Sequence, residues 1–154
     1  MEHIETLENL ETFLGLALVS YEPVPRIEHP GIRISHACEN IARHIKSGDQ
    51  EAARIGCRII VTDPHLPFGK LIKSGIARAL KQRIELLSAH ERASLVDKTV
   101  ELLSLQFCPR EAEDYCKAVK RIGPSAVQDV INSTCATNDK SKRLLNYLRQ
   151  SYSN

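Results

Sequence analysis

Apolar residues recur along this chain every three to four positions, which is the spacing of one face of an α-helix. Within residues 1–20 the apolar positions are Ile4, Leu7, Leu10, Leu14 and Leu18, with glutamates between them. This spacing predicts an acidic amphipathic helix. Similar patterns continue to the C-terminal end, and no stretch alternates in the way a half-buried β-strand does.

Residues 63–87 form the longest two-sided helical pattern. Two prolines open it, and its apolar or small positions are Phe68, Leu71, Ile72, Gly75, Ile76, Ala79, Leu80, Ile84 and Leu87. This spacing predicts a helix from about residue 68 to residue 87 that lies at the centre of the packing. Because small residues permit close approach of neighbours, Gly75→Leu is expected to overpack the core and cost about 1–3 kcal/mol.

Residues 21–32 contain three prolines, which excludes a helix and a central strand, so we expect an extended strap. The strap is either a connector laid over the bundle or a proline-rich peptide presented to a partner. The next helix should stop at Ser47-Gly48, and Asp49 should cap the one that follows. That helix should end at Thr62-Asp63-Pro64.

Ser88 and Glu91 form an S-x-x-E capping box, which predicts the start of another helix. Its expected core positions are Leu95, Val96, Val100, Leu103 and Phe107. Pro109 is placed at the first position of the next helix, whose expected inner face is Ala112, Tyr115, Cys116, Val119 and Ile122. Gly123-Pro124 should separate it from a further helix, a last helix should bury Leu144, Leu145 and Leu148, and residues 151–154 should fray.

These elements predict a single all-α domain over residues 1–154, with about eight helices and antiparallel helical hairpins in residues 33–150. The composition agrees, since 42% of the 154 residues are hydrophobic but only 5% are aromatic and tryptophan is absent. The architecture is either a superhelix of stacked hairpins or a compact irregular bundle. The starts of alternate helices are spaced as in helical-hairpin repeats.

One segment resembles a known repeat. Asp63-Pro64, Phe68, Lys70 and the run from Ile76 to Leu80 are similar to one repeat of the HEAT type (armadillo-like), in which an Asp-Pro turn precedes a helix rich in alanine and leucine. The resemblance implies an interaction scaffold whose concave helix faces bind proteins or nucleic-acid backbones. It implies no catalytic residues.

Basic residues gather on two of the expected helices, and they are the candidate binding residues. The first group is Lys70, Lys73, Arg78 and Lys81, the second is Lys117, Lys120 and Arg121, and exposed His65 lies on the turn before the first group. They could contact phosphates, with a strong dependence on salt. They could equally be a solvated helix surface, because acidic residues lie nearby and no aromatic residues are interleaved for stacking bases.

The remaining chemistry-bearing residues predict no reactive site. The five cysteines are widely spaced, which suits neither a disulfide framework nor zinc, and the pair formed by Glu111 and Asp114 is explained by its place at a helix start. We therefore expect no catalytic residue, metal or cofactor.

The function predicted from the sequence is a cytoplasmic, non-enzymatic adaptor or scaffold that binds an unidentified protein partner. The alternative is a nucleic-acid-binding domain that uses the basic face near residues 68–87. Self-association is left open, and membrane insertion is not expected because the longest apolar run, Phe13 to Val19, is too short.

Overall fold

The computed structural model describes residues 2–151, and residues 152–154 of the predicted frayed tail lie outside the described residues. The described part contains eight α-helices and two short 3-10 helices, so the all-α prediction is confirmed. The elements are α1 (Leu7–Leu14), η1 (Val19–Tyr21), α2 (Pro30–Lys46), α3 (Gln50–Thr62), α4 (Gly69–Gln82), η2 (Ile84–Leu86), α5 (Ala89–Leu103), α6 (Ala112–Ile122), α7 (Pro124–Ser133) and α8 (Asp139–Gln150).

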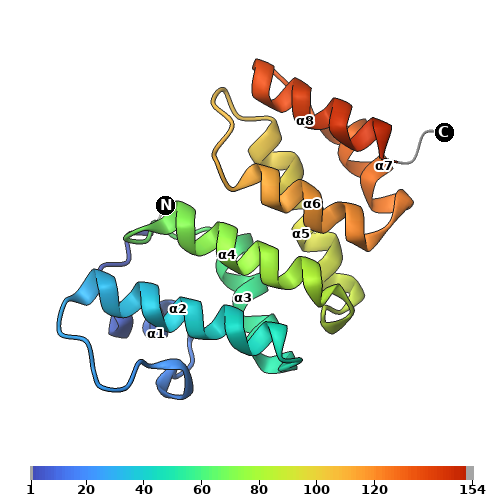
Figure 1. Cartoon of the computed structure of the whole chain (residues 1–154). Coiled ribbons are helices and arrows are strands. Elements are labelled where there is room, and N and C mark those ends of the chain that lie inside the picture. Colours follow the sequence, from blue (N-terminus) through green and yellow to red (C-terminus); the bar gives the residue numbers. More distant parts are fainter. Residues whose placement is uncertain (1, 152–154) are drawn as a thin grey trace.

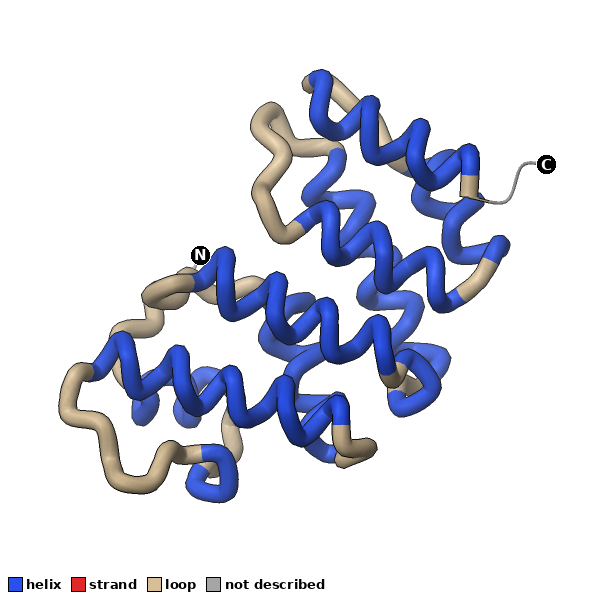
Figure 2. The backbone as a smooth tube through the Cα atoms, in the orientation of Figure 1, coloured by secondary structure: helices blue, strands red, loops and turns tan. Residues whose placement is uncertain are grey.

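The helices form two layers. Helices α2, α4, α6 and α8 follow one another in the front layer of Figure 1, and α1, α3, α5 and α7 lie behind them. Each even-numbered helix therefore contacts the next even-numbered helix as well as odd-numbered helices in the second layer. Figure 2 shows that loops join the helices at the ends of the layers, so successive helices run back and forth. Helix α4 lies between α2 and α6 and also contacts α3, which makes it the central helix.

Several helix boundaries agree with the capping residues read from the sequence. Gly48 takes a positive φ of 98° after α2, and the Asp49 carboxylate accepts a hydrogen bond from the Ala52 amide at the start of α3. Ser88 and Glu91 form the predicted capping box. These interactions satisfy amide groups that have no partner within the helix.

The first helix and the strap differ from their predictions. Helix α1 covers only Leu7–Leu14, because Gly15 adopts the left-handed conformation with a φ of 71° and ends it. Ile4 and Leu18 are buried, as the pattern required, but they lie outside the helix. The strap is shorter than residues 21–32 because α2 already begins at Pro30, whose missing N–H costs nothing at a first helical position.

The helix predicted to run from residue 68 to residue 87 is also shorter, since α4 ends at Gln82. Arg83 leaves the helical conformation, and its guanidinium donates to the Lys46 carbonyl at the end of α2 and to the Glu85 carboxylate. The side chain of Arg83 thus ties the end of α4 to the turn after α2. Ile84–Leu86 then form a 3-10 turn, so the apolar pattern continued past the end of the helix.

Two predictions around the start of α6 are wrong. Phe107 was expected in the core, but α5 ends at Leu103 and Phe107 is 82% exposed in the loop that follows. Pro109 was expected to begin α6, but the helix begins at Ala112 and Pro109 lies in the preceding turn. The inner face predicted for α6 is otherwise confirmed, because Ala112, Tyr115, Cys116 and Val119 are fully buried.

The close approach assigned to Gly75 is found at another glycine. A Cβ atom added at Gly75 would have no neighbouring atom within 4 Å, so the overpacking expected for Gly75→Leu is contradicted. A Cβ atom on Gly56 of α3 would lie 2.9 Å from a methyl group of Ile45 and 2.9 Å from one of Ile76. Helices α2, α3 and α4 therefore meet at Gly56.

None of the helices in the described residues is long and apolar enough to cross a membrane.

Candidate functional site

The structure does not bring all of the predicted binding residues onto one surface. Lys70 and Arg78 are exposed on α4 and His65 is exposed in the loop before it, while Lys81 is only half-buried. Lys73, predicted to lie on the basic surface, is buried with 6% of its surface exposed. The basic face of α4 is interrupted at Lys73, which has a structural role.

Lys73 belongs to a buried ion-pair cluster. Its ammonium group lies 2.6 Å from one carboxylate oxygen of Asp63, and the ammonium group of Lys98 lies 3.1 Å from the other. Lys98 also pairs with the exposed carboxylate of Glu101 at 3.0 Å. Asp63 thus joins the end of α3 to both α4 and α5. A buried charge needs such partners because removal from water is costly.

The second predicted group lies on the next helix of the front layer. Lys117 pairs with Glu113 at 3.7 Å, and the Lys120 ammonium group lies 5.4 Å from the centre of the Tyr147 ring on α8. Arg121 is exposed at the end of α6. Two of these three cations are therefore engaged by groups of the chain itself, and the group is distinct from the exposed cations of α4.

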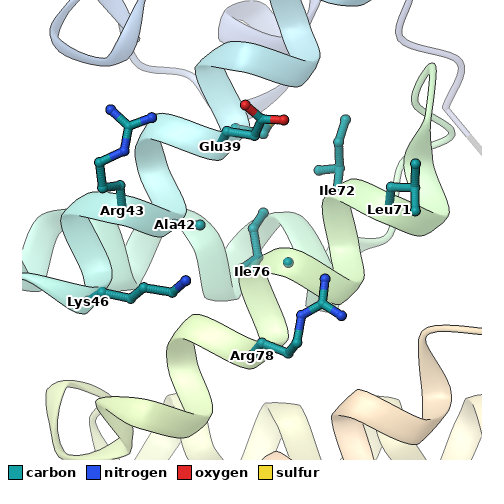
Figure 3. A pocket seen from close by; sticks show the side chains of 10 residues that line it. Glu39, Ala42, Arg43, Lys46, Leu71, Ile72, Ile76 and Arg78 are labelled. Carbon is teal, nitrogen blue, oxygen red and sulfur yellow. The ribbon is translucent and has the colours of Figure 1, made fainter.

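An open groove of about 280 Å³ runs between α2 and α4. Figure 3 shows Lys46 reaching from α2 toward α4 and Arg78 projecting from α4, while Arg43 extends from α2 with its guanidinium turned away from both. Arg43 and Lys46 are exposed and form no ion pair within the described residues, and Arg78 has only a distant contact of 4.0 Å with Asp114. Glu39 is the single carboxylate lining the groove, so positive charge dominates it.

Exposed apolar side chains extend the groove toward the start of α4. Leu71 is 56% exposed and lines both the groove and an adjoining hollow of about 270 Å³. Phe68, 52% exposed, and Ile32, 39% exposed, line the hollow as well. We call the groove and the hollow together the α2–α4 groove. It combines an apolar end with a basic end, which a solvated helix surface does not require.

Sequence reasoning missed Arg43 and Lys46. They are three positions apart on α2 and so share a face, a signal that is present in the sequence. The pairing of this face with Arg78 was not visible, since it depends on how α2 and α4 pack.

A second cavity, of about 460 Å³, opens at the start of α4. Its wall includes the predicted residues His65, Lys70 and Lys73, together with Asp63 and Glu111. Glu111 is 6% exposed, and its Oε1 atom has no hydrogen-bond partner in the described structure. The hydroxyl group of Tyr115, one turn along α6, is also buried without a partner. Burial, with the negative charges of Glu111 and Asp63, raises the pKa of Tyr115, so this hydroxyl stays protonated.

The cysteines differ sharply in accessibility. Burial raises the pKa of the Cys38, Cys57 and Cys116 thiols to about 12. Cys135 is exposed and Cys108 is intermediate. Within the described residues, histidine, cysteine and carboxylate side chains do not gather in any group of three that could hold a metal.

A thiol titration should therefore resolve these classes. In native protein at about pH 8, an aromatic disulfide reagent should react first with Cys135 and then with Cys108, whereas the three buried thiols react only after denaturation, because the reactive species is the thiolate. Replacing Cys135 with serine should remove the fastest phase. Rapid reaction of all five thiols in the native state would contradict the packing described above.

Comparison of the chain with protein-family models, with curated protein sequences and with solved structures gives no match.

Proposed function

We propose that the chain is a protein-interaction module that binds an acidic, amphipathic segment of a partner protein in the α2–α4 groove. Arg43 and Lys46, which lack ion-pair partners within the described residues, lie beside an open groove and carry this proposal. Binding of such a segment requires no catalytic residue, so the module is proposed to be non-enzymatic and to act as an adaptor or scaffold.

The two ends of the α2–α4 groove suit different parts of such a segment. Phe68, Leu71 and Ile32 supply exposed apolar surface, against which apolar side chains at helical spacing can be buried. Arg43, Lys46 and Arg78 supply cations for carboxylates on the flank of the segment. Charges of this kind increase the association rate and select against basic partners more than they increase affinity.

Binding of a designed peptide tests the proposal. The peptide is a fluorescent helix with leucines at every third and fourth position and glutamates along one flank, and fluorescence anisotropy measures its binding. The double substitution Arg43→Glu and Lys46→Glu should weaken binding at least tenfold, because it replaces two attractive charges with two repulsive ones. Leu71→Ser should weaken binding through lost apolar contact.

A control with the same change in net charge uses Arg54→Glu and Lys142→Glu, two exposed positions outside the groove. Binding by this control should change by less than twofold. Equal weakening in both double variants would show that only the net charge of the protein matters, and it would reject the α2–α4 groove as the binding site. If the peptide does not bind but DNA or RNA oligonucleotides bind at low salt, and the groove variant weakens that binding, nucleic-acid binding replaces this proposal.

A further inference from the structure

We propose that the cavity at the start of α4 binds a zwitterionic ligand with an apolar body, such as an apolar amino acid or a short peptide with free ends. The site differs from the α2–α4 groove in its charge pattern, although Leu71 and Phe68 line both. Its volume of about 460 Å³ falls within the usual range for small-molecule sites.

Ionisable side chains from three different elements line this cavity. Asp63 comes from the end of α3, Lys73 from α4 and Glu111 from the start of α6, and Lys98 of α5 pairs with Asp63. Structural ion pairs account for Asp63, Lys73 and Lys98. They do not account for Glu111, whose Oε1 atom is buried and makes no hydrogen bond to any described group. An unsatisfied buried acceptor is costly, and a ligand donor would remove the cost.

The backbone around the cavity is held in an uncommon conformation. Asp63 and Phe68 have φ values of 54° and 56°, and they are the only residues other than glycine with positive φ in residues 2–151. Both line the cavity. The left-handed conformation is unfavourable for most side chains and is concentrated at functional sites, where the surrounding structure enforces it.

The start of α4, which also lines the cavity, favours an anion. Helix α4 begins at Gly69 without a side-chain cap, and the Gly69 amide donates to the Leu66 carbonyl. The groups that attract an anion here are therefore the amides of Lys70 and Leu71 and the positive end of the helix dipole. Lys70 is exposed there. An anionic group of the ligand therefore fits at the start of α4, and an ammonium group fits near Glu111 at the start of α6.

The middle of the cavity is apolar. Leu66, Leu102, Leu105, Phe68 and Leu71 line it, and Leu105 is 43% exposed. The charged residues in the wall, Asp63 and Glu111 against Lys70 and Lys73, are balanced in number. A ligand with both charges and an apolar body matches this lining better than a simple anion or a simple amine does.

Three related dipeptides test the inference on the native protein. Leucyl-leucine carries both charges, N-acetyl-leucyl-leucine lacks the ammonium group, and leucyl-leucinamide lacks the carboxylate. Amide chemical shifts in NMR spectra measure binding. We expect leucyl-leucine to shift the amides of residues 63–73 and 105–111, and each blocked form to bind at least tenfold more weakly. Equal binding of all three, or no binding of leucyl-leucine at millimolar concentration, would overturn the proposal.

Two conservative variants separate the contributions of the charges. Glu111→Gln should reduce the preference for leucyl-leucine over its acetylated form to less than threefold, and Lys70→Gln should reduce the preference over the amide form. If the Tyr115 hydroxyl turns to donate to Glu111 and already satisfies it, Glu111→Gln leaves the preference unchanged, and that result rejects the role of Glu111. The double variant Arg43→Glu and Lys46→Glu should bind leucyl-leucine as tightly as the native protein does. The proposal for this cavity and the proposal for the α2–α4 groove are therefore tested separately.

Discussion

Asp63→Asn should destabilise the protein by about 3 kcal/mol, because it removes the negative charge that faces the buried ammonium groups of Lys73 and Lys98. The side chains of Lys73 and Lys98 are only 7% and 9% exposed, and Asp63 lies within 3.1 Å of both. Asparagine keeps the size of the side chain and tolerates the left-handed backbone of residue 63, so the change removes the charge with little added strain. Chemical unfolding at neutral pH, followed by circular dichroism, measures the loss.

Two further variants show whether the loss comes from the buried charges. Asp97→Asn removes an exposed carboxylate from α5 and should change the stability by less than about 0.5 kcal/mol. Combining Asp63→Asn with Lys73→Met should recover part of the loss, because methionine fills a similar volume and needs no counter-charge, while Lys98 keeps Glu101. A cost below about 1 kcal/mol for Asp63→Asn would mean that water or other groups compensate the two lysines.

Helix boundaries set by local chemistry were predictable from the sequence. Gly48, Asp49 and the Ser88 capping box act within one turn of their own positions, so their effect does not depend on the rest of the fold. The wrong boundaries were decided by distant contacts. Helix α4 ends early because Arg83 reaches the Lys46 carbonyl on α2, a partner that is remote in the sequence.

The candidate site was less predictable for the same reason. A 3.6-residue period separates two faces of a helix, but α4 contacts α2, α3 and α6, so part of its polar face is covered. Lys73 therefore meets Asp63 inside the structure instead of solvent. At the start of α4 the opposite occurs, since Phe68 and Leu71 belong to the apolar pattern and yet remain half exposed. These two exposed side chains line the α2–α4 groove.

The position of small residues likewise depends on tertiary packing, and Gly56→Val gives the second large expected effect. The first added carbon would lie 2.9 Å from methyl groups of Ile45 and Ile76, and valine brings two more carbons into the same space. Both isoleucines are fully buried, so they have little freedom to move aside. We expect a loss of about 1–3 kcal/mol in the free energy of unfolding, the usual cost of overpacking a core.

The matched control is Gly75→Val, the same substitution in the middle of α4. No atom lies within 4 Å of an added Cβ there, and valine is a better helix former than glycine, so stability should stay within about 0.5 kcal/mol of the native value or rise slightly. Both variants are compared by urea unfolding. Since the backbone is helical at both positions, a difference between them reports packing alone. Equal stabilities would show that α2, α3 and α4 do not meet closely at Gly56.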